Sequence, residues 1–173
     1  FAVYRDFPPY SFLKDGQPAG IDIDIGKRIA SEMGVDVDFR VGTAEGLIAS
    51  GEALFDVVLN LEVVEHVADA DQFLIDTASL VRPGGLMICA TLNRTAKARA
   101  MAVIGAEYIL RWLPPGTHDW DKFVTPAEMT SALERAGMDV EPAQGVSYAP
   151  LSGQWKLSND TDGNYRSVAR RPQ

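Results

Sequence analysis

The stretch FDVVLNLEVVEHV, residues 55–67, joins an apolar run to a polar segment without an intervening turn. Its first part, Phe55 to Asn60, is a nearly continuous apolar run, which is typical of a parallel strand covered on both faces. Leu61 to Val67 predicts the start of a helix that resumes through Asp71 to Leu80. A strand that leads directly into a helix is the unit of an α/β fold.

The same alternation continues in both directions from this stretch. Helix signals include Gly34 after an apolar periodicity, and Thr125-Pro126 as N-cap and first residue of a helix that ends before Gly137. We therefore predict an α/β fold with a doubly wound, mostly parallel Rossmann-like sheet, helices on both faces and an antiparallel last strand. The expected strands are 1–4, 35–41, 55–60, 86–90, 140–144 and 165–170, and the expected helices are 22–33, 44–50, 61–80 and 125–136, with a turn at Asp15-Gly16.

Length and composition limit the class of protein. With 173 residues, 46% of them hydrophobic, the chain suits one α/β domain over 1–173. A formal charge of −8 argues against a nucleic-acid partner, because phosphate binding requires a basic face. No apolar leader or stretch long enough to span a bilayer is visible, so we expect a cytoplasmic protein. The single cysteine, Cys89, lies in an apolar run and is expected to be buried and inert.

Polar residues that follow the central strand form the main candidate site. In an open α/β sheet, ligands bind outside the carboxyl ends of the strands. Glu62, Glu65 and His66 stand at i, i+3 and i+4, which on a helix puts two carboxylates and an imidazole on one face. His66 is a candidate general base. The alternative is structural: the glutamates favour the positive end of the helix dipole and His66 packs locally.

Several strings in the chain resemble one known family. FDVVLNLEVVEHV at 55–67, LVRPGG at 80–85, TLNRT at 91–95 and GTHDW at 116–120 are similar, in order and spacing, to the ubiquinone-biosynthesis O-methyltransferase family, class I enzymes that use S-adenosylmethionine. The resemblance covers about residues 41–173 and includes a helical insertion at about 94–122.

This resemblance implies methyl transfer from S-adenosylmethionine to a phenolic ubiquinone precursor. It places catalysis at Glu62, Glu65 and His66, where a magnesium ion would orient the phenol oxygen and lower its pKa. It implies that Leu61 packs against the adenosyl group and that Ala44 and Glu45 pass the adenine ring. Asp22 matches an acidic residue that binds ribose hydroxyls in such folds, although a helix-capping role is the alternative.

The front of the chain, residues 1–40, resembles a different family. FPPYSF at 7–12 and DGQPAGIDID at 15–24 are similar to the first lobe of a periplasmic polar amino-acid solute-binding protein. No GxGxG turn for the cofactor occurs anywhere in the chain, and residues 5–9 place bulky side chains and prolines in the first loop instead. The pattern indicates a recombined or engineered chimera. Its alternative functions are a fold without catalytic activity and a small-solute binding module.

The segment Ala100 to Leu113 is nearly all apolar and is flanked by basic residues. It suits an interfacial helix that makes peripheral contact with the inner membrane and accepts a polyprenylated phenol as substrate. The alternative is a buried helix within the insertion.

Overall fold

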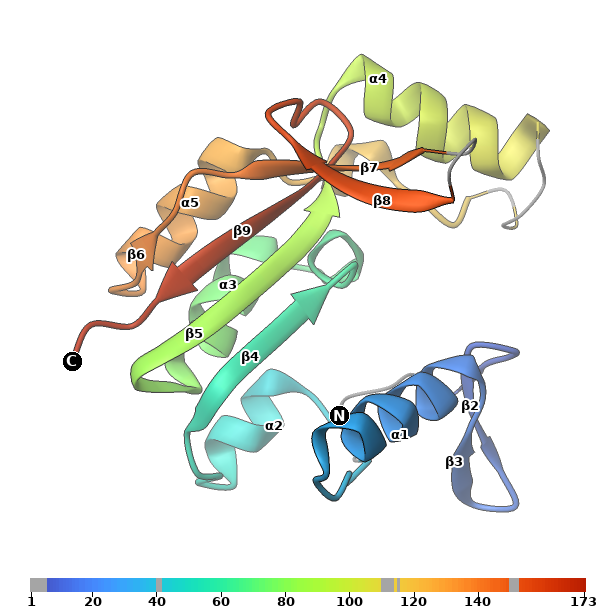
Figure 1. Cartoon of the computed structure of the whole chain (residues 1–173). Coiled ribbons are helices and arrows are strands. Elements are labelled where there is room, and N and C mark those ends of the chain that lie inside the picture. The colour runs from blue at the N-terminus through green and yellow to red at the C-terminus, as the bar shows by residue number, and fades with distance from the viewer. Residues whose placement is uncertain (1–5, 40–41, 110–113, 115, 150–152) are drawn as a thin grey trace. The chain divides into compact units, whose positions relative to one another are not determined.

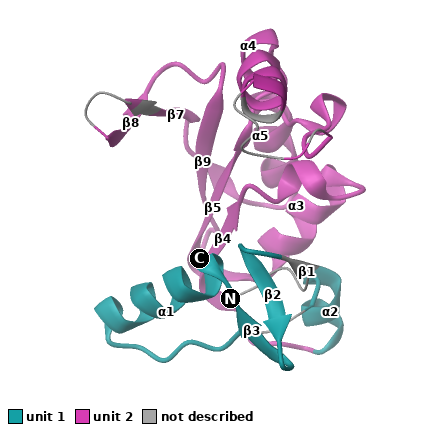
Figure 2. Ribbon diagram, turned by 90° about the vertical axis from the view of Figure 1, so that its right-hand side faces the viewer, with its two compact units in different colours: residues 1–50 teal, residues 51–173 magenta. Residues whose placement is uncertain are grey.

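The computed structural model describes residues 6–39, 42–109, 114, 116–149 and 153–173. The chain divides into two compact units, Phe1–Ser50 and Gly51–Gln173, coloured separately in Figure 2. The expected single domain over 1–173, with a boundary between its two parts near residue 40, stays a prediction.

The first unit contains a small antiparallel sheet and two helices. The strands are β1 (Asp6–Phe7), β2 (Ser11–Lys14) and β3 (Gln17–Ala19), in the order β1-β2-β3. Asp15 and Gly16 adopt positive φ angles of 53° and 78° between β2 and β3, which confirms the expected turn. Helix α1 spans Ile21–Met33 and helix α2 spans Ala44–Ala49.

Helix α1 begins two residues earlier than an N-cap at Asp22 predicts. Its N-cap is Gly20, and not Asp22 or Asp24. A glycine is required there, because φ is 119° and a Cβ would lie 2.3 Å from the Tyr10 carbonyl oxygen. At the other end Gly34 is the left-handed C-cap, as expected.

Two strands expected in the first unit differ from the structure or lie outside it. Residues 35–39 are irregular, so the described part of the strand expected over 35–41 is not formed. No described strand pairs with this segment, and an isolated strand gains little stability. The strand expected at 1–4 and residues 40 and 41 lie outside the described residues.

The second unit is built on one mixed sheet (Figure 1). Its order is β4-β5-β9-β7-β8, with β6 also paired to β9. The α/β class and the antiparallel last strand are confirmed. The sheet contains one parallel pair among the described strands, β4 with β5, and is therefore less parallel than expected. The strands β7, β8 and β9 follow one another without the helical crossover that parallel strands need, so they pair antiparallel. The strands are β4 (Phe55–Leu61), β5 (Val81–Leu92), β6 (Asp139–Val140), β7 (Gln144–Ala149), β8 (Gln154–Ser158) and β9 (Asn164–Arg170).

The main core lies between this sheet and two helices, α3 (Ala70–Ser79) and α5 (Pro126–Arg135). Met87 and Cys89 of β5 and Tyr165 of β9 point into it, and all three are at most 1% exposed. The apolar side chains of β4 that alternate with its core-facing residues are exposed: Val57, Leu59 and Leu61.

The expected helical insertion at about 94–122 is present in short pieces. Helix α4 (Ala96–Ala98) leads into η2 (Arg99–Ile109), which has π-helical hydrogen bonding, and η3 (Trp120–Lys122) is a 3₁₀ turn. The Trp120 indole N–H donates to the Thr95 carbonyl at 3.1 Å and so ties the end of the insertion to its beginning. Residues 110–113 lie outside the described residues.

Candidate functional site

The helix expected to start at Leu61 is not formed. Glu62 has a left-handed backbone with φ 54°, and its N–H donates to the Ala90 carbonyl at 2.8 Å, so it still belongs to the sheet edge. Val64–His66 make a single 3₁₀ turn, η1, and α3 begins only at Ala70. Glu62, Glu65 and His66 therefore do not share one helix face, because the sheet hydrogen bond at Glu62 redirects the chain before a helical turn can close.

The structure nevertheless brings Glu62 and Glu65 together at the carboxyl end of β4. Glu65 is 2% exposed; its Oε2 accepts a hydrogen bond of 2.8 Å from the Thr91 hydroxyl, and its Oε1 has no partner among the described residues. Glu62 accepts from the Asn164 amide at 3.4 Å. Loss of water around the Glu62 carboxyl and the negative charge of Glu65 raise the pKa of Glu62 to about 8.

Two carboxyl groups that lie close together in a site shielded from water disfavour a second negative charge. Because the pKa of Glu62 lies above neutral pH, the pair holds one proton near pH 7. Glu62 is an exposed residue as a whole, whereas Glu65 is buried, so the pair joins the interior to the surface. Such a pair is suited to exchange a proton with a hydroxyl group that approaches from outside.

His66 faces a second histidine. Its ring centroid lies 6.1 Å from that of His118, which in turn lies 6.1 Å from the ring of Phe123. Across the described ranges, no three acidic, histidine or cysteine side chains come together in a way that could hold a metal ion. The magnesium site expected at Glu62, Glu65 and His66 is therefore not formed, because His66 turns toward His118 and the three residues do not follow one helix.

The residues expected to hold the cofactor fall in both units. Asp22 is in the first turn of α1, Ala44 is the buried first residue of α2, and Glu45 is exposed. Hydrogen bonds from its own backbone N–H and from Thr43 lower the pKa of Glu45. Leu61 is the last residue of β4 and is 50% exposed. Their convergence on one cofactor stays a prediction.

The start of α1 does not fit the carboxylate of S-adenosylmethionine. In the fold class expected here, a glycine-rich turn and the following helix offer free backbone N–H groups to an anion. At α1 the N–H groups of Ile21 and Asp22 donate instead to the carbonyls of Pro9 and Tyr10, at 3.1 and 3.0 Å.

Sequence reasoning missed two residues of the site at the end of β4. Asn60 is 4% exposed, and neither polar atom of its side chain has a hydrogen-bond partner in the described part of the chain. Thr91 is fully buried and positions Glu65. Asn60 could have been found, since it is a polar residue at the end of an apolar strand. Thr91 directly follows the expected strand 86–90, but only the pairing of β4 with β5 shows that it lies near Glu65.

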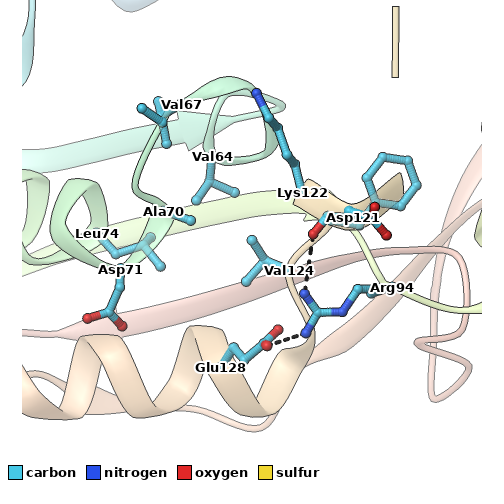
Figure 3. A pocket seen from close by; sticks show the side chains of 12 residues that line it. Val64, Val67, Ala70, Asp71, Leu74, Arg94, Asp121, Lys122, Val124 and Glu128 are labelled. Carbon is cyan, nitrogen blue, oxygen red and sulfur yellow. Dashed lines mark hydrogen bonds and ion pairs between the residues drawn. The ribbon is translucent and has the colours of Figure 1, made fainter. Parts of the chain in front are cut away.

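A pocket of about 340 Å³ opens between η1, α3 and the start of α5 (Figure 3). Arg94 forms an ion pair with Glu128 on its rim and donates to the Asp121 carbonyl at 3.5 Å. Nothing in the sequence had pointed to this pocket, because its walls come from three separated segments. They are Val64, Val67, Ala68, Ala70, Asp71, Leu74, Arg94, Asp121, Lys122, Phe123, Val124 and Glu128.

Two solved structures have a fold similar to that of this chain. It is similar to an O-methyltransferase family protein from Burkholderia thailandensis, with a TM-score of 0.54, 15% identity and coverage of 88% of this chain and 41% of that one. It is also similar to a possible histamine N-methyltransferase from Thermotoga maritima, with a TM-score of 0.54, 17% identity and coverage of 83% and 68%. At these identities the likeness concerns the fold alone.

The sequence is similar to ubiquinone biosynthesis O-methyltransferases, which confirms the expected resemblance. It is 57% identical to the enzyme of Parvibaculum lavamentivorans over 142 residues, 82% of this chain and 56% of the relative. It is 52% identical to that of Brucella anthropi over 151 residues, 87% of this chain and 60% of the relative. The chain thus spans less than two thirds of the length of these relatives.

The front of the chain matches a second family. Residues 1–62 match the family of bacterial extracellular solute-binding proteins, family 3. This match confirms the expected resemblance of the front and fits a chimera. The 142 residues aligned to the Parvibaculum lavamentivorans enzyme are more than the segment 41–173 contains, so that alignment begins before residue 41. It therefore overlaps the match of residues 1–62 to solute-binding proteins.

Proposed function

We propose that this chain carries the acceptor-binding part of an O-methyltransferase that transfers a methyl group from S-adenosylmethionine to a phenolic ubiquinone precursor. The observation that carries the proposal is 57% identity, over 82% of the chain, to an enzyme named for that reaction. The carboxyl pair at the end of β4 supports it, because ligands of such sheets bind at this edge.

The chain's own residues would handle the proton of the acceptor. S-adenosylmethionine supplies an electrophilic methyl group, and a phenol attacks it best after losing its proton. Glu65 Oε1 is buried and has no hydrogen-bond partner among the described residues, and the pKa of the neighbouring Glu62 is raised, so the pair is a candidate proton acceptor. His66 is the alternative general base. Magnesium has no role in this proposal because its three expected ligands do not converge.

A second candidate is a folded chimera that binds no methyl donor. It is favoured by the missing glycine turn and by the closed N-terminus of α1. A third is capture of a small amino acid by the front, favoured by the match of residues 1–62 to solute-binding proteins.

Isothermal titration calorimetry with S-adenosylhomocysteine separates the first two candidates. If the methyltransferase proposal is right, binding is saturable and is weakened by Asp22→Ala and by Leu61→Arg, whereas Asp24→Ala, in the same turn of α1, leaves it unchanged. Methylation of a catechol should then follow and be lost in Glu65→Gln. A chain that is folded by circular dichroism and gives no heat with this ligand would reject the proposal. Titration with glutamine and arginine tests the third candidate.

We also infer that the protein works in the cytoplasm and contacts the inner membrane through Ala100 to Leu113, where it would meet a polyprenylated phenol. The described part of this segment exposes Met101, Ile104, Tyr108 and Ile109. None of the described helices is long and apolar enough to cross a bilayer. Co-sedimentation with anionic vesicles should fall in Met101→Ser/Ile104→Ser and stay unchanged in Val35→Ser, an exposed apolar residue of the first unit.

A further inference from the structure

The pocket between η1, α3 and α5 offers a binding site that the methyl-transfer proposal does not use. Its volume of about 340 Å³ lies within the range of small-molecule sites. Its inner walls are apolar: Val64, Leu74 and Phe123 are each 1% exposed. A ligand that fills it would therefore bury an apolar group.

The charges around the pocket are mostly paired. Arg94 forms an ion pair with Glu128, and Asp71 forms one with Arg135. Asp121 and Lys122 have no ion pair within the part of the chain that is described. In Figure 3 the Lys122 side chain extends on the side of Val64 and Val67, and the Asp121 carboxylate lies on the opposite side.

We propose that this pocket binds a small amphipathic anion, an alkyl or aryl carboxylate. Its apolar part packs against Val64, Val67 and Leu74, and its carboxylate pairs with the Lys122 ammonium. A water molecule takes up roughly 30 Å³ in the liquid. If each non-hydrogen atom of a ligand takes up a similar volume, the pocket holds about ten of them. Octanoate has this size and this charge.

Titration of the full-length chain with octanoate, followed by amide chemical shifts, tests the proposal. Octanoate should bind at one site and shift the signals of Val64, Val67 and Ala70. Lys122→Gln should weaken binding about tenfold, the usual order of effect for one charge-assisted contact. Lys156→Gln, which removes an exposed lysine from β8, should leave binding unchanged.

Octanol, which has the same chain length without the charge, should bind more weakly than octanoate. Its affinity for the wild type and for Lys122→Gln should be the same. Val67→Asp, which places a negative charge in the half-buried wall, should abolish octanoate binding while the amide spectrum remains that of a folded chain. The proposal is overturned if octanoate shifts signals elsewhere, if Lys156→Gln weakens binding as much as Lys122→Gln, or if Val67→Asp has no effect. None of these measurements requires methyl transfer, so the outcome is independent of the proposed function.

Discussion

Glu62 combines a left-handed backbone with a carboxyl group whose pKa is raised to about 8 from an ordinary value of 4.5. Between these values the folded chain holds a proton that the unfolded chain releases. The stabilisation from this proton is complete below the ordinary pKa and is lost as the pH rises through about 8. Folding stability should therefore fall across this window.

Glu62→Gln mimics the protonated carboxyl and removes this pH dependence. We expect the urea midpoint of the variant, relative to the wild type, to rise from pH 5 to about pH 8 and to stay constant above it. Glu134→Gln, an exposed glutamate of α5, is the matched control and should give a constant difference. A difference that is also constant for Glu62→Gln would show that Glu62 and Glu65 do not share a proton.

Cys89 is 1% exposed in the main core, and its burial raises the pKa of the thiol to about 12. The thiolate is the reactive form, so almost none is present at neutral pH. Labelling of the native chain with a thiol-specific disulfide reagent should proceed only as fast as the chain unfolds, and should become rapid in denaturant. Stoichiometric labelling of the native chain within seconds would contradict the buried position.

Among the helices, α5 begins with the most complete set of end contacts. The Thr125 hydroxyl accepts from the Glu128 N–H at 3.3 Å, and the Glu128 carboxylate accepts from the Thr125 N–H at 2.8 Å. This reciprocal capping box, with Pro126 at the first helical position, is why the start of α5 could be predicted from the sequence.

Thr125→Ala should destabilise the protein by about 1 kcal/mol, because it leaves an N–H of the first turn without its partner. Thr130→Ala, in the middle of the same helix, should be neutral or slightly stabilising because alanine is the better helix former. Urea unfolding followed by circular dichroism measures both. Equal effects of the two substitutions would mean that the cap contributes nothing.

The contrast between α5 and the segment after β4 shows where local signals fail. Residues 61–67 have the spacing of a helix. The hydrogen bond from the Glu62 N–H to the Ala90 carbonyl instead extends the sheet, and Glu62 adopts a left-handed backbone that does not continue as a helix. That bond joins residues far apart in sequence. The spacing of Glu62, Glu65 and His66 therefore could not show that only the first two would meet.

At the scale of the whole molecule, the two units contain very different cores. Every residue of both hydrophobic clusters lies within 51–173. In the described part of 1–50, the buried apolar side chains are Ile23, Ala30 and Ala44. A segment of about fifty residues with so small a core has little to offset its conformational entropy.

We therefore expect a fragment of residues 51–173 to unfold cooperatively in urea, and a fragment of residues 1–50 to be unfolded by circular dichroism. The exposed apolar face of β4 should make the longer fragment prone to association, so dilute samples and sedimentation velocity are needed. A stable fold for 1–50 alone would show that the front is an independent domain. Loss of the fold in 51–173 would show that it depends on the front.

The sequence by itself determined the α/β class, the turn at Asp15-Gly16, the caps of α1 and α5 at Gly34 and Thr125, and the two family resemblances. These features depend on neighbours in the chain or on the order of short strings. Tertiary structure alone decided that β4 and β5 are the one parallel pair among the described strands, that Thr91 positions Glu65, and that three separated segments enclose a pocket beside Lys122. Strand register and the closure of a cavity depend on contacts between residues distant in sequence, and no local pattern encodes them.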